Sequence, residues 1–477
     1  MSGHRKILSR RVRSSGLDRP GSLIWDWRPR LVAPNPSRRG NAPSHLHYAR
    51  HAAVPPAHTM TDSLPPLSHP HPPGTARAAL AYPAYRLIWA GLFLSSIGTW
   101  MQNLALPAYI DDRTGSAKIV GLLVFAQLGP LLLLAIPGAI IADKVNRRTF
   151  LLWMQWVQLV FSLVLAFVVS IHGPIWALFL AQVAIGIGNA LNAPAFQATV
   201  PLLVDRRDLA GAISMNSVQL NGSRVIGPTL AALLSLGGVT TAQLFIINAA
   251  TYLFLILALS RVALPDIRST HSETGWRRAL TGLRISRERP VLARLLVTMA
   301  SFSFFSLVYV ALFSSVARLN FGIDPVGPTY RWLYAIWGFG ALCGALATGT
   351  FLAQSHRPSV IRRGFLGFAV SLAAFAAVRN PVPAFPIGFF LGAFYFMSAN
   401  AMVTVFQQNL KDTERVSVMP LWFMAFGGTV TLGGLVGGPI IDAMGARWVL
   451  AFGALFALFL SRFANLDRLP KSAFLTQ

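Results

Sequence analysis

Residues 119–148 read IVGLLVFAQLGPLLLLAIPGAIIADKVNRR and decide the fold of this chain. The first 24 of them carry no charge, and Asp143, Lys144, Arg147 and Arg148 follow directly. A helix that crosses the hydrocarbon core of a bilayer needs about 20 consecutive, mostly apolar residues, whereas runs of 10–14 are more typical of buried soluble helices. This stretch therefore predicts a membrane-spanning helix that ends in a short charged loop.

The same pattern recurs from about residue 85 onward. Apolar runs of spanning length lie near residues 85–110, 118–142, 149–171, 174–200, 212–236, 239–262, 291–317, 329–353, 359–378, 383–408, 417–441 and 446–463. Only 12% of the 477 residues are charged, which is about half the ~25% found in soluble domains. We therefore expect an all-α integral membrane protein with twelve transmembrane helices in a lipid bilayer.

The placement of the net charge of +25 predicts the orientation. Loops after the even-numbered runs, taken with the first residues of the run that follows, hold seventeen Lys and Arg residues, whereas the corresponding segments after the odd-numbered runs hold six. Because cytoplasmic loops are enriched in Lys and Arg, both termini are expected in the cytoplasm and the protein in the plasma (inner) membrane. Positive charge confined to short loops indicates membrane topology, so no nucleic-acid partner is expected.

Polar segments divide the chain into five regions. Residues 1–80 are basic and rich in Pro and His, and such a composition predicts a disordered tail. Translation from Met60 is an alternative, in which residues 1–59 are a mis-annotated extension. The other regions are a six-helix half at 81–262, a cytoplasmic linker at 263–290, a second six-helix half at 291–463 and a cytoplasmic tail at 464–477.

The two halves carry similar residues at a nearly constant offset. Gly227-Pro228 recurs as Gly438-Pro439, Ala139 corresponds to Gly349, and Asn192 corresponds to Asn400, at offsets of 211, 210 and 208 residues. Two six-helix pseudo-repeats joined by a cytoplasmic linker predict a substrate site between the halves, near the middle of the membrane.

The charged loop at residues 137–148 resembles the Gly-x-x-x-Asp-Arg-x-Gly-Arg-Arg signature of the major facilitator superfamily. Further segments are similar to one branch of it, the enterobactin-type siderophore exporters and related drug-efflux permeases. These segments are GTWMQN at 98–103, NAPA at 192–195, MNS at 215–217, RVIGP at 224–228 and GFGALCG at 338–344. The resemblance covers about residues 82–463 and implies the major facilitator fold, with two halves that rock about a central site.

The resemblance also implies gating residues. In the family, the cluster that corresponds to Asp143, Lys144, Arg147 and Arg148 closes the cytoplasmic side; the alternative is that the arginines only hold the loop inside. The chain departs from the pattern at Ala139, where the family has glycine, and at Ala353, where an acid is expected in the second half.

Gly227-Pro228 resembles the fifth-helix antiporter motif of the family, which favours export over uptake. Small residues allow helices to approach closely, and proline bends a helix, so this pair is a second candidate for the gate. Ordinary small-residue packing is the alternative.

Arg224 is the most informative single residue, because it lies deep in the run at 212–236. A cation at that depth is expensive unless it is paired or hydrated, so it should face the cavity between the halves. We expect it to bind an anionic substrate; a structural hydrogen-bonding role is the alternative. Gln102, Asn103 and Asn400 are further substrate-binding candidates, although amides also hold membrane helices together.

The sequence contains no pattern for enzymatic chemistry. It lacks a phosphate-binding Gly-x-x-x-x-Gly-Lys-Ser/Thr motif, a His-Glu-x-x-His motif and a Gly-x-Ser-x-Gly motif. The single cysteine, Cys343, excludes an intramolecular disulfide and paired-cysteine metal sites. We therefore expect no enzyme, no cofactor and no metal.

The leading hypothesis is secondary-active export of a siderophore-like or drug-like small molecule. Proton coupling is implied by the resemblance, with Asp143 and Asp442, both near helix ends, as the available carboxylates. The alternatives are broad efflux of amphipathic drugs or lipids, and a non-transporting receptor or scaffold with the same fold.

Overall fold

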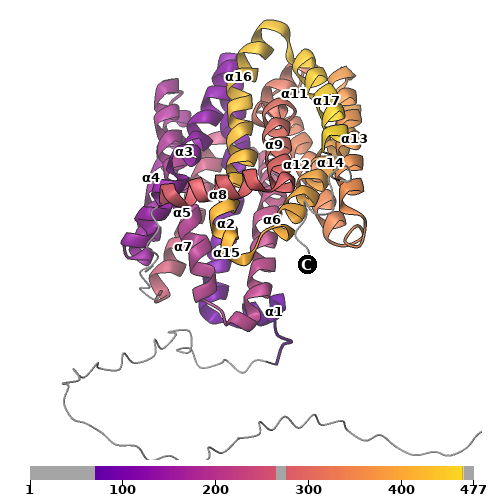
Figure 1. Cartoon of the computed structure of the whole chain (residues 1–477). Helices are drawn as coiled ribbons and strands as arrows, with labels where there is room; N and C mark the ends of the chain where they lie inside the picture. The colour runs from indigo at the N-terminus through magenta and orange to yellow at the C-terminus, as the bar shows by residue number, and fades with distance from the viewer. Residues whose placement is uncertain (1–69, 265–274, 465, 467–477) are drawn as a thin grey trace, which may run out of the picture. The chain divides into compact units, whose positions relative to one another are not determined.

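The computed structural model describes residues 70–264, 275–464 and 466, and these residues form α-helices without β-strands (Figure 1). Side chains at 135–144 and at 193–194, 197–198, 275–276, 278–279, 412–413 and 416 lie outside the description. The expected disordered tail lies almost wholly outside the described residues, as does most of the C-terminal tail. So do the side chains of Asp143 and Lys144.

The N-terminal half contains six long helices. They are α2 (Pro83–Thr114), α3 (Ala117–Lys144), α4 (Arg147–Ser170), α5 (Ile175–Thr199), α6 (Leu209–Leu236) and α7 (Thr241–Arg261). A short helix α1 (Ala76–Leu80) precedes them, and 3-10 turns η1 (Val200–Leu202) and η2 (Arg206–Asp208) link α5 to α6. These helices coincide with the first six apolar runs.

The C-terminal half repeats this arrangement with two interrupted segments. The seventh spanning segment is divided into α9 (Pro290–Phe305), α10 (Val308–Ala311) and α11 (Phe313–Phe321). It is followed by α12 (Pro328–Gly349), α13 (Arg357–Ala377) and α14 (Pro381–Gln408). The eleventh segment comprises α15 (Asp412–Phe423), a π-helical turn η3 (Met424–Gly428) and α16 (Thr429–Met444), and α17 (Ala446–Phe463) is the last.

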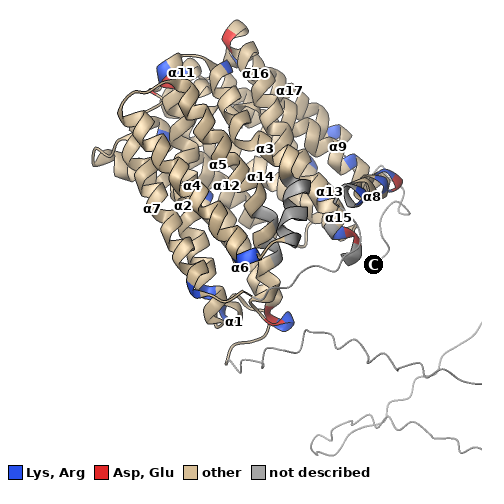
Figure 2. Ribbon diagram, turned by 90° about the vertical axis from the view of Figure 1, so that its left-hand side faces the viewer, with Lys and Arg blue, Asp and Glu red and all other residues tan. Residues whose placement is uncertain are grey.

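The described helices have the lengths and surfaces of a membrane protein. Within the described residues, nine spans are long and apolar enough to cross a bilayer by length and composition. Large apolar side chains such as Phe167, Trp176 and Trp448 lie exposed on the outside of the bundle, where lipid can contact them. Figure 2 places the charged residues mainly at the two ends of the bundle. Together with α2, α6 and the interrupted segment α9–α11, these nine spans give twelve spanning segments in the described residues of an all-α, multi-pass membrane protein.

Equivalent helices pack in the same way in the two halves. In the first half α2 contacts α6 and α7, and α4 contacts α5 and α7. In the second half α9 correspondingly contacts α16 and α17, and α13 contacts α14 and α17. Across the halves, α3 packs along α16 and α6 packs along α12, which are again equivalent pairs. This repetition is the two-fold pseudo-symmetry expected from the offsets in the sequence.

The halves meet closely where glycine replaces a side chain. A Cβ atom on Gly438 of α16 would lie 2.6 Å from the carbonyl oxygen of Ala117 and 2.8 Å from the Cα of Lys118 on α3. A Cβ on Gly338 of α12 would lie 3.3 Å from the carbonyl oxygen of Arg224 on α6. Small residues therefore bring the backbones of opposite halves into contact.

The connection between the halves contains α8 (Gly275–Glu288), which runs crosswise to the spanning helices and packs on α15 (Figure 1). We call the end of the bundle that carries α8 the α8 end. The far end is the opposite one, formed by the loops at 115–116, 322–327 and 445. Arg289, directly after α8, donates to the carbonyl of Asn409 at 2.9 Å and to Glu414 at 2.6 Å.

Glu414 should stabilise the α8 end in a pH-dependent way. Burial alone would raise its pKa, but hydrogen bonds from Arg289 and from the backbone N–H of Lys411 hold the pKa below its ordinary value of 4.5. Glu414→Gln should therefore lower the free energy of unfolding by about 1 kcal/mol at neutral pH. This contribution is present above pH 4.5 and is lost as the pH falls through the lowered pKa.

The thermal midpoint of the purified protein at several pH values tests this expectation. Glu288→Gln is the matched control, because its ion pair with Arg284 is exposed and contributes little. A Glu414→Gln variant as stable as the Glu288→Gln variant at neutral pH would contradict the assigned role.

Candidate functional site

Arg224 lies near the middle of α6 and between the two halves of the protein. At 1.5 Å per residue it is about 22 Å from the first residue of α6 and about 18 Å from the last. Its guanidinium carbon lies 5.2 Å from the ring centroid of Trp100 on α2 and 5.2 Å from that of Phe396 on α14. One ring comes from each half, so the cation lies between aromatic faces of opposite halves.

This environment leaves part of the guanidinium without a polar partner. The Nε atom of Arg224 is buried and has no hydrogen bond, and no described carboxylate forms an ion pair with this side chain. Two cation–π contacts supply about 1–4 kcal/mol together. A buried cation with an unsatisfied donor still costs several kcal/mol, and an anion hydrogen-bonded to it would offset that cost.

The neighbouring residues of α6 explain this position. Gly227 lies one turn after Arg224, and a Cβ there would lie 2.7 Å from both the carbonyl oxygen of Ile97 and the Cβ of Trp100. Glycine therefore lets α6 approach α2 and brings Trp100 to Arg224. Pro228 has no backbone N–H, so the carbonyl of Arg224 loses its helical donor and faces Gly338 of α12 instead.

A buried aromatic cluster of the C-terminal half adjoins Phe396, whose ring centroid lies 4.6 Å from that of Tyr395. Tyr395 stacks on Trp337 with ring centroids 6.2 Å apart and on Phe426 at 6.3 Å. The indole N–H of Trp337 donates to the hydroxyl of Tyr309 at 3.1 Å. Tyr309 and Phe426 come from the two interrupted segments, α10 and η3. Irregular helices of this kind are common at binding sites, because they place side chains that a straight helix cannot.

Asn400 lies on the same face of α14 as Phe396, since the two residues are four apart in the helix. Its side chain is partly exposed. It therefore remains a candidate ligand on the helix face that carries Phe396.

Gln102 and Asn103 instead join helices within the N-terminal half. Gln102 is almost fully buried, and its Oε1 accepts hydrogen bonds from Ser162 at 2.8 Å and Asn248 at 2.7 Å. Asn103 accepts a hydrogen bond from Gln127 at 2.5 Å. For Gln102 these contacts favour the packing interpretation over the predicted substrate contact, because its acceptor is already occupied by α4 and α7.

The predicted gate is described only in part. Arg148 donates its Nε to the carbonyl of Leu259 at 2.8 Å, and an Nη2 to that of Ser260, so it caps the C-terminal end of α7. Arg147 begins α4. Arg148 therefore has a structural role inside one half, whatever part it takes in a gate.

A buried ion pair that the sequence analysis missed joins the halves at the far end. Asp111 of α2 is fully buried and accepts hydrogen bonds from Ser315 at 2.7 Å and from the Nε and Nη2 of Arg318, both at 3.0 Å. Arg318 also donates to the carbonyl of Gly115 at 2.9 Å. The predicted span near 85–110 ended four residues before the end of α2, so Asp111 fell outside it.

Asp442 of α16 makes the second polar contact between the halves at this end. It accepts hydrogen bonds from the hydroxyl of Ser116 at 2.6 Å and from the backbone N–H groups of Ala117 at 2.7 Å and Lys118 at 3.0 Å. A carboxylate at a helix N-terminus is favoured by the unpaired N–H groups and by the helix dipole. These two sets of contacts join described residues of the two halves by hydrogen bonds at the far end.

The fold and the central cation between two halves define a multi-pass membrane transporter. Comparison with known proteins identifies the family, because the family model described as a transmembrane secretion effector matches residues 74–474. The chain belongs to this family, a branch of the major facilitator superfamily.

Curated relatives support the assignment. The enterobactin exporter EntS of Shigella boydii serotype 4 is 29% identical over 309 residues, which are 62% of this chain and 69% of the relative. EntS of Escherichia coli O1:K1 matches to the same extent. The family and these relatives are transporters, not enzymes.

Solved structures show the same fold. An inward-facing, unoccupied bacterial homologue of the human lysosomal transporter Spinster aligns with a TM-score of 0.64 at 16% identity, over 82% of this chain and 98% of the other. The nucleoside transporter NupG aligns with a TM-score of 0.61 at 15% identity, over 81% of this chain and 99% of the other.

Proposed function

We propose that this protein is a secondary-active exporter of amphipathic, anionic small molecules. The observation that carries the proposal is Arg224, held between Trp100 and Phe396 of opposite halves with a buried, unpartnered Nε. A carboxylate or phenolate would satisfy the guanidinium, and the rings of Trp100 and Phe396 would contact the apolar part of the same molecule. Siderophore-like and acidic drug-like compounds have this combination of groups.

Transport would proceed by alternating access of the central site. The α8 end carries the basic loops, so we place it in the cytoplasm, together with both termini, in the inner membrane. The Asp111–Arg318 pair and the Asp442 cap hold the far end closed. Substrate would reach Arg224 from the α8 end, and rocking of the halves along the α3–α16 and α6–α12 contacts would then open the far end. Similarity to the enterobactin exporters favours export.

Asp111 is the carboxylate that we assign to proton coupling. Opening of the far end would separate it from Arg318 and expose it to the outside, where it can take up a proton. When the far end closes, Arg318 pairs with Asp111 again, and the proton leaves toward the α8 end, so that its inward passage is coupled to export. Three further ionisable groups interact electrostatically with a member of this pair, namely Asp112, Tyr330 and Asp442.

Transport by the purified protein in proteoliposomes tests the proposed function. An imposed proton gradient should drive accumulation of an amphipathic carboxylate. Its uncharged amide should be transported at least about tenfold more slowly, because the amide loses one charge-assisted hydrogen bond to the site. Equal transport of acid and amide would favour broad amphipathic efflux. A complete lack of flux across a panel of acids and amides would overturn the proposal in favour of a non-transporting role.

Substitution of Asp111 separates coupling from transport itself. We expect Asp111→Asn to abolish the stimulation by a proton gradient while substrate exchange at equal pH continues, because the site at Arg224 is intact. Asp324→Asn is the control, since Asp324 is an exposed carboxylate at the same end. Undiminished stimulation of the Asp111→Asn variant would show that another group carries the proton.

A further inference from the structure

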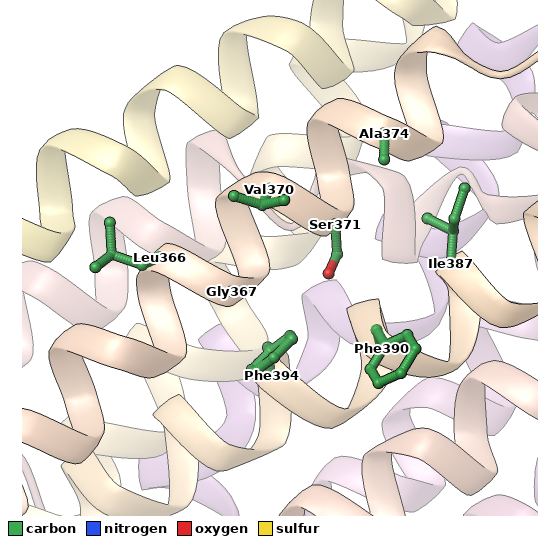
Figure 3. Close-up of a pocket in the computed structure, with 8 residues that line it drawn as sticks. All are labelled: Leu366, Gly367, Val370, Ser371, Ala374, Ile387, Phe390 and Phe394. Atoms are coloured by element: carbon green, nitrogen blue, oxygen red, sulfur yellow. The ribbon is translucent and has the colours of Figure 1, made fainter.

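A lateral groove separates the outer faces of α13 and α14 (Figure 3). It has a volume of about 440 Å³, and its walls are apolar side chains, among them Leu366 and Val370 of α13 and Phe390 and Phe394 of α14. Ser371 is the polar side chain that points into it (Figure 3). The groove belongs to the C-terminal half alone and is separate from the residues around Arg224.

The groove opens toward lipid. Val370 is 69% exposed and Phe390 is 52% exposed, on helices that span the membrane. Glycine at position 367 lets the ring of Phe394 pack against α13 at the base of the groove, because a Cβ there would lie 2.5 Å from that ring. The lining of α13 extends from Leu366 to Ala374, about 12 Å along the helix axis. An apolar slot of this shape on a lipid-facing surface fits an acyl chain.

Positive charge lies at one end of this slot. Arg362 and Arg363 are exposed and precede Leu366 and Gly367 by four residues each, so they lie on the groove face of α13. They belong to the first turns of α13, at the α8 end. The sequence from 357 to 408, which forms α13 and α14, contains no Asp or Glu, and no described carboxylate pairs with either arginine.

We propose that this surface is a binding site for an anionic phospholipid of the leaflet at the α8 end. The acyl chain lies in the groove between α13 and α14, and the phosphate of the headgroup lies between the guanidinium groups of Arg362 and Arg363. Long arginine side chains extend toward the headgroup layer, which brings their charge to the phosphate while their stems cover apolar surface. Paired cations at the membrane surface favour anionic over zwitterionic lipids.

Native mass spectrometry of the full-length protein from nanodiscs of equal phosphatidylglycerol and phosphatidylethanolamine tests the site. We expect the wild type to retain phosphatidylglycerol in preference to phosphatidylethanolamine. In the double variant Arg362→Gln/Arg363→Gln, the ratio of the two retained lipids should fall about tenfold. The control variant, Arg284→Gln/Arg287→Gln, loses two arginines of α8 at the same end of the bundle. It should keep the preference for phosphatidylglycerol. Equal losses in the two double variants would overturn the proposal.

Filling the groove tests the acyl chain separately. Ser371→Phe should reduce retention of phosphatidylglycerol and of phosphatidylethanolamine together, provided that its thermal midpoint shows a folded protein. Inorganic phosphate at millimolar concentration should not displace the lipid, because the chain supplies much of the binding. Displacement by phosphate, or unchanged retention in a folded Ser371→Phe variant, would contradict an acyl-chain site.

Discussion

Replacing Arg224 with alanine is expected to reduce efflux of an anionic substrate from cells at least about 30-fold. The reason is that loss of one partner of a buried charged contact costs about 2 kcal/mol or more. Arg224→Lys should be intermediate, because an ammonium group keeps the charge but loses the planar stacking between Trp100 and Phe396. The measurement is the initial efflux rate of a radiolabelled acid, normalised to the amount of protein in the membrane.

Two comparisons make this expectation specific. Arg379→Ala removes an exposed arginine between α13 and α14 and should leave the rate unchanged. Phe396→Leu keeps an apolar side chain on α14 but removes one ring face, so it should weaken transport less than Arg224→Ala. An Arg224→Ala variant with the efflux rate of the wild type would contradict the assignment of Arg224 to the substrate site, on which the proposed function rests.

Gly344→Val should prevent accumulation of the folded C-terminal half. A Cβ on Gly344 would clash with the carbonyl of Ala393, and a Cβ on Gly340, one turn earlier, with that of Phe389. On the opposite helix, a Cβ on Gly392 would clash with the carbonyl of Trp337. Helices α12 and α14 thus lie backbone against backbone, and a branched side chain must push them apart. We expect a loss of about 3 kcal/mol or more in the free energy of unfolding.

Gly349→Val is the matched control, because it lies in the same helix and a Cβ there meets no atom within 4 Å. Fluorescence-detected size exclusion and the thermal midpoint in detergent measure both variants. Equal stability of Gly344→Val and Gly349→Val would show that the α12–α14 contact is looser than described.

The spanning segments could be predicted from the sequence because apolar length is a local property. The run at 118–142 became α3, and the run at 383–408 became α14, with small shifts at their ends. The interruption of the seventh segment was not predicted. Residues 305–313, FSLVYVALF, contain neither Gly nor Pro, so nothing local indicates the break between α9 and α11.

The candidate site was predictable only where a single residue gave the signal. Arg224 is conspicuous because an intramembrane cation is expensive wherever its helix packs. Its partners Trp100 and Phe396 lie more than a hundred residues away on either side, and only the fold brings them together. For Gln102 the sequence located a polar residue at membrane depth but could not tell the cavity face of α2 from the face that packs on α4 and α7.

Equilibrium binding to the purified protein tests the central claim most directly. The ligands are an amphipathic carboxylate and its matched amide, measured with the wild type and with Arg224→Ala in nanodiscs. We expect the wild type to prefer the carboxylate about tenfold or more, and the variant to bind both ligands with similar affinity. The same preference for the carboxylate in both proteins would contradict a substrate site at Arg224.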